Sequence, residues 1–239
     1  MPNIVITGAS RGLGNAIAEK FAASGYNLYL SSRNEPALYK AMEGLQTRFP
    51  SVRVMAKPFD LSKTEEAKAL GKWILKQDAS IDILVNNAGN FLAGNIHDEK
   101  EGVLEEMINV NLYSAYHLTR TLLPAMIKQN LSNGTRAHIF NMCSIASLNA
   151  YANGGSYSIS KFALAGFSKN LREEMKQYFI KVTAVYPGAT YTDSWAGSGV
   201  DANRIMEAKD IADMIYASSQ LSPQATVEDI IIRPQLGDL

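Results

Sequence analysis

Short apolar runs and longer amphipathic stretches alternate along the whole chain. The first run, residues 3–7, is rich in β-branched side chains, which is typical of a strand buried on both faces of a parallel sheet. Similar runs recur to the end of the chain. We therefore expect strands at residues 3–7, 27–31, 52–56, 81–85, 139–142, 182–185 and 227–232.

Between the strands, apolar residues recur every three or four positions, which is the period of a helix that packs by one face. The pattern predicts helices after the turn at residues 8–14 and over residues 35–48, 62–77, 103–129, 157–179 and 207–219. Ser62 and Glu65 have the spacing of a capping box for the third of these helices. No repeat, low-complexity tract or linker interrupts the series, so we expect one α/β domain over residues 1–239.

Composition and charge narrow the classes of protein that the chain can belong to. Hydrophobic residues make up 46% of the sequence, and the 23 basic side chains equal the 23 acidic ones, which gives no indication of a nucleic-acid or membrane partner. The single cysteine, Cys143, fits a reducing compartment. The N-terminus lacks the features of a signal peptide, and the longest window without charge, residues 137–160, is too polar to span a membrane. We expect a soluble, cytoplasmic protein.

A glycine-rich turn joins the first predicted strand to the first predicted helix. Glycines let the backbone approach a pyrophosphate, and the helix N-terminus offers unpaired N–H groups to it. The turn reads G-x-x-x-G-x-G, and its context of strand, turn and helix predicts a dinucleotide site. The candidate cofactor-binding residues of the turn are Gly8, Ser10, Arg11, Gly12, Leu13 and Gly14.

The end of the second strand indicates which dinucleotide binds. An acidic residue there accepts hydrogen bonds from the ribose 2′-hydroxyl of NAD. This chain has Ser31-Ser32-Arg33-Asn34 instead. Arg33 and Arg11 together can hold a 2′-phosphate through charge-assisted hydrogen bonds, which favours NADP(H). The alternative is that both arginines are solvated surface residues.

Small and amide residues follow the ends of the other strands. Residues 86–89 read Asn-Asn-Ala-Gly, which suits a flat ring that lies close to the backbone. Residues 186–192 place hydroxyl groups at the same edge of the sheet, where ligands of open α/β sheets bind. Asp60 follows the third strand, and taken locally it is as well explained by a turn as by a ligand.

Tyr157 and Lys161 lie four positions apart and so share one face of a helix. A cation ~4 Å from a phenol, at an effective dielectric constant of about 20, is worth roughly 4 kcal/mol and lowers the pKa of the phenol toward the operating pH of a general acid or base. Ser144 follows the fifth strand, and its hydroxyl can donate to the same substrate oxygen. Taken alone, the spacing also fits a surface tyrosine stacked on the stem of a lysine.

Other candidate residues are weaker. Asn111 falls among the apolar residues of a long helix, where a packing role is favoured over a water-holding one. Residues 190–208, with Trp195, are expected to form a substrate lid, the alternative being an inert connector. The three histidines, His97, His117 and His138, have no metal-ligand spacing, so we expect no metal. Residues expected to line a substrate pocket are Asn90, Phe91, Leu148, Tyr151 and Trp195.

Jointly, these residues resemble the short-chain dehydrogenase/reductase family over essentially the whole chain. The matches are Thr7-Gly8-x-x-x-Gly12-x-Gly14, Asp60-Leu61, Asn86-Asn87-Ala88-Gly89, Asn111, Ser144, Tyr157-x-x-x-Lys161, and Pro187-Gly188 with Thr192. In this order and spacing the set is highly specific. Two departures are mild: Cys143 stands where the family often has another serine, and residues 149–154 are unusually polar for a loop on the substrate side.

The resemblance implies a fold and a set of catalytic residues. The fold is a Rossmann-like, doubly wound α/β domain with a seven-stranded parallel sheet of order 3-2-1-4-5-6-7 and helices on both faces. Tyr157 is implied as the general acid–base, with Lys161 lowering its pKa and holding the nicotinamide ribose. Ser144 polarises the carbonyl. Asn111 anchors a water of the proton relay, which revises its local interpretation.

The resemblance also implies the cofactor contacts beyond the glycine turn and Arg33, a position that matches the NADP-preferring members. These contacts are Asp60, Leu61, Asn87, Ala88, Gly89, Tyr157, Lys161, Pro187, Gly188 and Thr192. Among them, Asp60 contacts the adenine, Asn87 the adjacent ribose region and Thr192 the carboxamide.

We therefore expect an NADPH-dependent carbonyl reductase, or an alcohol dehydrogenase in the reverse direction, acting on a small carbonyl or alcohol substrate. The alternatives are a 3-oxoacyl-[acyl-carrier-protein] reductase and a non-catalytic NADP(H)-binding sensor or scaffold. The helices that carry Asn111 and Tyr157 are apolar over wide stripes, so a homodimer or homotetramer is expected.

Overall fold

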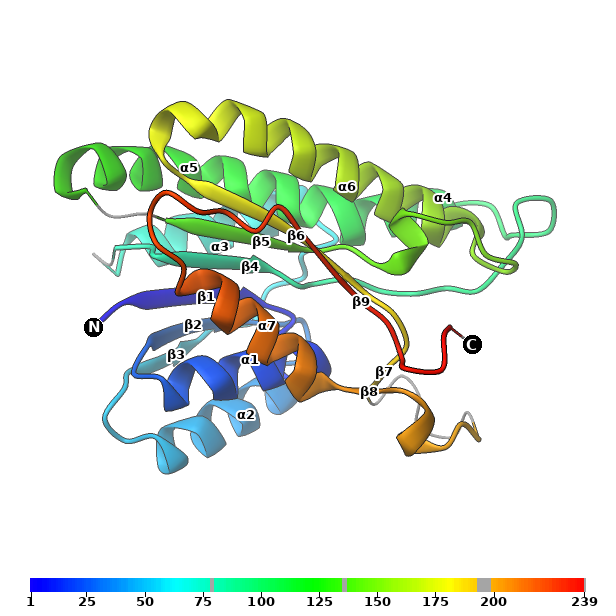
Figure 1. Cartoon of the computed structure of the whole chain (residues 1–239), viewed down its shortest axis with the longest axis horizontal. Coiled ribbons are helices and arrows are strands. Elements are labelled where there is room, and N and C mark those ends of the chain that lie inside the picture. The colour runs from blue at the N-terminus through cyan, green and yellow to red at the C-terminus, as the bar shows by residue number, and fades with distance from the viewer. Residues whose placement is uncertain (78–79, 135–136, 193–198, 239) are drawn as a thin grey trace.

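The computed structural model describes residues 1–77, 80–134, 137–192 and 199–238. A parallel sheet of order β3-β2-β1-β4-β5-β6-β9 runs through the middle of the molecule (Figure 1). Its strands are β1 (Asn3–Thr7), β2 (Asn27–Ser31), β3 (Val54–Ala56), β4 (Ile83–Asn86), β5 (His138–Met142), β6 (Lys181–Pro187) and β9 (Asp229–Ile232). Each neighbouring pair is parallel, so the predicted sheet order is confirmed.

Helices cover both faces of the sheet, as the doubly wound fold requires (Figure 1). One face carries α1 (Gly12–Ala23), α2 (Glu35–Arg48) and α7 (Ala208–Ser219). The other carries α3 (Thr64–Leu75), α4 (Val103–Ile108), α5 (Ser114–Asn133) and α6 (Gly155–Met175). Within the described residues, 3₁₀ turns lie at Ile145–Ser147, Lys176–Tyr178 and Ala202–Arg204, and a small parallel sheet pairs β7 (Thr190–Tyr191) with β8 (Met206–Glu207).

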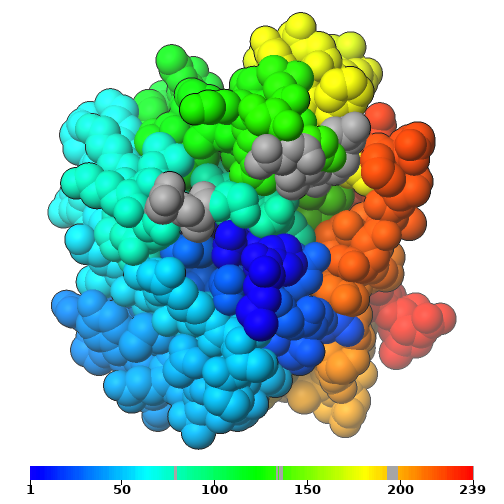
Figure 2. Space-filling model, turned by 90° about the vertical axis from the view of Figure 1, so that its left-hand side faces the viewer, coloured from blue at the N-terminus to red at the C-terminus, as the bar shows by residue number. Residues whose placement is uncertain are grey.

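The alternation of side chains along the strands builds a core on each face. In β1, Ile4 and Ile6 pack beneath α1, whereas Val5 belongs to the core beneath α3 and α5. Because each face is covered by helices, the strands are apolar on both sides, which is why they read as continuous runs in the sequence. Figure 2 shows the left-hand side of Figure 1, where the chain begins. The N-terminal residues lie at the surface, near the middle of this view.

One local prediction is wrong. The capping box of Ser62 and Glu65 does not form, because the Ser62 hydroxyl donates to the Asp60 carboxylate at 2.7 Å and α3 begins only at Thr64. Glu66, not Glu65, turns back to the chain and accepts from the Asp60 N–H at 2.6 Å. The long helix expected over residues 103–129 is present as an unbroken helical run, in which a π-helical turn at Asn109–Tyr113 joins α4 to α5.

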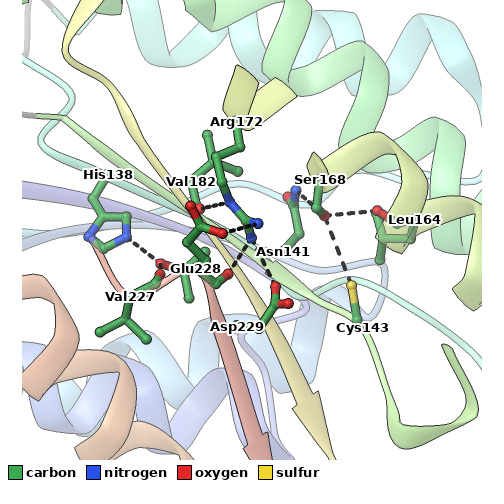
Figure 3. Close-up of polar contacts among 11 residues, drawn as sticks. His138, Asn141, Cys143, Leu164, Ser168, Arg172, Val182, Val227, Glu228 and Asp229 are labelled. Carbon is green, nitrogen blue, oxygen red and sulfur yellow. Dashed lines mark hydrogen bonds and ion pairs between the residues drawn. The ribbon is translucent and has the colours of Figure 1, made fainter. Parts of the chain in front are cut away.

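Helix α6 is held to the sheet by polar contacts spread along its length. Asn141 of β5 donates to the Ser168 hydroxyl at 2.9 Å, and its own amide oxygen accepts from Asn86 of β4 at 2.8 Å. Further along, the Arg172 guanidinium donates to the carbonyl of Val182 at 3.0 Å and pairs with Asp229 at 2.9 Å (Figure 3). A buried polar group stabilises the fold only when it is paired, so these contacts fix the position of α6 over β5, β6 and β9.

His138 is buried in the neutral form at the start of β5. The Thr183 hydroxyl donates to the carbonyl of Val227 at 2.5 Å, so it accepts from His138 Nε2, 2.7 Å away (Figure 3). The Nδ1 atom then carries no proton and has no partner among the described residues. Burial, with a smaller effect from Lys181, lowers the pKa of His138 to about 3.

This histidine makes stability depend on pH. Between pH 6.5 and about pH 3, His138 is protonated in the unfolded chain and neutral in the folded chain. The free energy of unfolding therefore falls as the pH falls through this window. We expect His138 to account for a loss of roughly 2 kcal/mol between pH 7 and pH 5. Denaturant unfolding at pH 7 and pH 5 measures this difference in the free energy of unfolding. It should be smaller in His138→Gln and unchanged in His97→Gln, which alters an exposed histidine. Equal pH slopes for the wild type and His138→Gln would contradict this account.

Candidate active site

The first two turns of α6 carry Tyr157 and Lys161. The Lys161 side chain is buried, and its ammonium donates to the carbonyl of Met142, the last residue of β5, at 2.8 Å. The same Nζ lies 5.8 Å from the centre of the Tyr157 ring. Met142 is the one acceptor that the described residues give this ammonium, so two of its three N–H groups are available to another ligand.

Gly89 shows why this part of the chain needs a glycine. A Cβ atom there would lie 2.9 Å from the Asn111 amide oxygen and 3.5 Å from Lys161 Nζ. The backbone after β4 therefore passes directly beside the ammonium. The structure thus brings together Gly89, Asn111 and Lys161, three of the residues that the sequence assigns to the candidate site.

Asn111 lies in the π-helical turn and is buried. Its amide oxygen accepts from the N–H of Asn90 at 2.9 Å, and its NH₂ group donates to the carbonyl of Asn90 at 3.1 Å and to the hydroxyl of Ser160 at 2.9 Å. π turns inside α-helices are frequently found at functional sites. The side chain of Asn111 thus fixes the loop after β4 against the residue that precedes Lys161.

Ser144 lies just past β5, at the start of the 3₁₀ turn Ile145–Ser147. Its Oγ atom accepts from the Ala146 N–H at 3.1 Å, and its N–H donates to the Ser147 hydroxyl at 3.2 Å. This reciprocal cap fixes the side chain while it leaves the hydroxyl proton free for a further acceptor. The Tyr157 hydroxyl, likewise, bonds to none of the described residues.

The glycine-rich turn is packed against the end of β4. Gly8 and Gly12 have φ angles of +66° and +55°, which favour glycine. The Asn87 amide donates to the carbonyls of Thr7 and Gly8 at 2.9 and 3.2 Å, and a Cβ atom on Gly14 would lie 2.6 Å from that amide. The side chain of Asn87, predicted to contact a ribose, is therefore bound to the turn itself.

The N-terminus of α1 faces the same edge of the sheet. Arg11 precedes the helix without a side-chain cap, and the first turn contains no acidic residue. The helix end therefore keeps the unpaired N–H groups and positive potential that bind an anion. Thr192 lies opposite, with its methyl group 3.3 Å from where a Cβ of Gly12 would be. Nearby, the N–H of Gly188 donates to the carbonyl of Ile232 at 2.8 Å, which fixes the turn after β6.

Arg33 and Asp60 lie at the far end of the site, after β2 and β3. Both arginines of the prediction, Arg11 and Arg33, are exposed, whereas Leu61 is buried. Burial raises the pKa of the Asp60 carboxyl, but the hydroxyl and N–H of Ser62, with Lys63 and Arg33, outweigh it and lower that pKa below its usual value. Asp60 is thus ionised, and it lies close enough to Arg33 for the two charges to interact.

On the substrate side, Phe91 meets the Tyr157 ring edge to face, with centroids 4.9 Å apart. The segment predicted to form a lid, residues 190–208, has its two ends paired with each other through β7 and β8. Trp195 lies outside the described residues. The C-terminal segment also reaches this side, which the sequence pattern did not indicate. The Tyr151 hydroxyl donates to Asp238 at 2.9 Å, Asp238 pairs with Arg233, and Arg204 donates to the carbonyl of Gly237 at 3.0 Å. The charges at residues 233 and 238 were the available signal.

Cys143, next to Ser144, is buried, and burial raises the pKa of its thiol to about 11, although Lys161 opposes the rise. The thiol is therefore protonated at neutral pH and is a poor nucleophile.

In the described part of the chain, no three His, Cys, Asp or Glu side chains gather so as to hold a metal ion. None of the helices described has the length and hydropathy needed to cross a membrane.

Comparison with known proteins gives relatives and solved structures that match nearly the whole chain. A family model described as short chain dehydrogenase matches residues 2–202. An uncharacterized oxidoreductase of Staphylococcus epidermidis is 32% identical over 231 residues, 96% of each chain. A sepiapterin reductase of Chlorobaculum tepidum is 31% identical over 244 residues, 99% of this chain and 97% of the relative.

Among solved structures, an alcohol dehydrogenase from the archaeon Thermococcus sibiricus, complexed with 5-hydroxy-NADP, superposes with a TM-score of 0.88 at 27% identity, covering 98% of this chain and 97% of that one. A metagenomic short-chain oxidoreductase in complex with NADP superposes with a TM-score of 0.83 at 30% identity and the same coverage.

Proposed function

The chain belongs to the short-chain dehydrogenase family of oxidoreductases, and from this premise we propose that it is an NADP(H)-dependent carbonyl reductase, or an alcohol dehydrogenase in the reverse direction. The observation that carries the proposal is the buried Lys161 ammonium, which lies beside the Tyr157 ring and has two N–H groups available to a ligand. Burying an ammonium group is costly unless its charge is paired and hydrogen-bonded, which favours a further ligand at its two available N–H groups.

The residues at the sheet edge fit a dinucleotide. Gly8 and Gly12 have no side chains that would keep a pyrophosphate away from the backbone of the turn. The first turn of α1 contains no acidic residue that would repel the pyrophosphate. Arg11 and Arg33 supply positive charge where a 2′-phosphate would lie, and Thr192 faces the turn. The neighbours that were solved with NADP or 5-hydroxy-NADP support the same cofactor.

Three side chains of the chain perform the proton chemistry in this proposal. When bound, the cofactor supplies or accepts the hydride. Tyr157 gives its hydroxyl proton to the carbonyl oxygen as that oxygen gains negative charge, and takes the proton back in the oxidation. Ser144 donates a hydrogen bond to the same oxygen. Lys161 stabilises the phenolate that is left on Tyr157 and binds the nicotinamide ribose through its remaining N–H groups.

Relatives support the reaction class. The Thermococcus sibiricus structure is that of an alcohol dehydrogenase, and the Chlorobaculum tepidum relative is a sepiapterin reductase. We further propose a cytoplasmic location and a homodimer or homotetramer. The assembly is supported by exposed apolar side chains: Leu104 of α4, Tyr113 of the π turn, and Ile159 and Phe162 of α6.

Replacing the phenol tests the reaction. Tyr157→Phe removes the proton donor and keeps the ring that packs on Phe91. We expect kcat to fall by a factor of about 10² to 10⁴, the usual contribution of general acid catalysis, while the Kd for NADPH stays within about twofold. NADPH oxidation against a panel of ketones, aldehydes and quinones measures the first, and quenching or enhancement of NADPH fluorescence measures the second.

The same panel, extended by a 3-oxoacyl thioester on its carrier protein, separates the alternatives. Turnover restricted to 3-oxoacyl thioesters on the carrier protein would favour the acyl-carrier-protein reductase. Tight NADPH binding without turnover of any carbonyl would favour the sensor. Wild-type rates in Tyr157→Phe would end the assignment of Tyr157.

Arg33 is expected to set the coenzyme preference. A charge-assisted hydrogen bond is worth about 1.5–3 kcal/mol, so Arg33→Ala should lower kcat/KM for NADPH by roughly 10- to 100-fold and leave that for NADH within about twofold. The matched control is Arg53→Ala, because Arg53 is an exposed arginine just before the amino end of β3, away from the glycine turn. Equal losses with both coenzymes would contradict the role of Arg33.

A further inference from the structure

The loop after β4 forms a strap over the start of α6. The strap, residues 90–99, is held at its first residue by Asn111, which bonds to both backbone groups of Asn90. Its middle runs beside the turn that leads into α6, where the N–H of Gly94 donates to the carbonyl of Asn153 at 3.0 Å and the N–H of Asn153 donates to Asn95 Oδ1 at 3.1 Å. A parallel bridge pairs Gly94 with Gly154.

The last residue of the strap, Glu99, binds the first turn of α6. Its Oε1 atom accepts from the N–H of Ser156 at 2.8 Å, and its Oε2 atom accepts from the Ser156 hydroxyl. Two glycines make room for this carboxylate. A Cβ atom on Gly94 would lie 2.6 Å from Glu99 Cγ, and one on Gly155 would collide with the carboxylate itself.

Helix α6 has no cap of its own. The residue before it, Gly154, has no side chain, and the first turn contains no acidic residue. The first N–H groups of a helix are unpaired and carry a partial positive charge, and an acceptor or an anion at this point stabilises the turn. Glu99 therefore supplies from outside the helix both the hydrogen-bond acceptor and the negative charge that the sequence of α6 lacks.

Tyr157 is the next residue after Ser156, and the strap touches it directly as well, through the edge-to-face contact of Phe91 with its ring. We propose that Glu99 is a positioning residue for Tyr157: it fixes the first turn of α6 so that the phenol faces the reacting oxygen. The part of this inference that concerns the reaction rests on the proposed function. The tie between Glu99 and α6 does not.

Three variants test the proposal. Glu99→Ala removes both contacts, Glu99→Gln keeps an acceptor for the Ser156 N–H but removes the charge, and Glu101→Gln removes the charge of an exposed neighbour as the matched control. Amide hydrogen exchange is measured over residues 154–160 without substrate. We expect faster exchange in Glu99→Ala and wild-type exchange in Glu101→Gln. Unchanged exchange in Glu99→Ala overturns the proposal.

Kinetics separate positioning from a merely structural role. We expect kcat of Glu99→Ala to fall at least about tenfold, within the hundredfold that a displacement of about 1 Å costs, with Glu99→Gln between it and the wild type. The Kd for NADPH should be unchanged, and the primary isotope effect with 4-deuterated NADPH should rise because the chemical step becomes slower. A loss of Tm with unchanged kcat and isotope effect overturns the positioning role.

The same experiment distinguishes the two failures. If the wild type turns over no carbonyl or alcohol, the proposed function fails. In that case, faster exchange in Glu99→Ala beside wild-type exchange in Glu101→Gln still supports the tie of Glu99 to α6, and equal exchange in the two variants overturns it.

Discussion

The site depends on one buried ammonium held between the end of a strand and the start of a helix. Lys161 reaches from α6 to the carbonyl of Met142, and that hydrogen bond fixes its charge beside the Tyr157 ring. A charge in such a place is stable only while its partners stay in position. The architecture around it serves to keep α6 and β5 in one fixed relation.

Several contacts maintain that relation. Asn141 and Ser168 join β5 to α6 near the middle of the helix, and Arg172 joins the helix to β6 and β9 (Figure 3). On the other side, Asn111 binds the loop after β4 and the Ser160 hydroxyl, so the π turn and α6 share one network. Helix, sheet edge and loop are therefore fixed by side chains that lie far apart in the sequence.

Most of the fold was predictable because it follows from local pattern. The strand of residues 27–31 and the helix of residues 35–48 have the predicted bounds, since a buried parallel strand and a helix with Asn34 as its cap each have a clear signature. The order of the sheet came from the resemblance rather than from the residues. The capping box of Ser62 failed because Asp60 competes for the same hydroxyl, and spacing does not reveal such competition.

Three residues that the sequence assigns to the site lie together in the structure, whereas several of the contacts around them were not predictable. The motif residues Gly89, Asn111 and Lys161 do gather, but the bond of the Asn87 amide to the glycine turn was not foreseen. Glu99 and Asp238 escaped notice because each acts on a residue more than fifty positions away, on Ser156 and Tyr151 respectively. Contacts of this kind depend on how loops pack, and no periodicity in the sequence encodes them.

The most direct measurement of the central claim is a crystal structure of the complex with NADP⁺. The account predicts that Lys161 Nζ keeps its bond to Met142 and lies within about 3 Å of a nicotinamide ribose hydroxyl, with the Tyr157 hydroxyl facing the nicotinamide ring. A nicotinamide riboside bound away from Lys161, or a Lys161 side chain that turns out of its place to admit the cofactor, would contradict it.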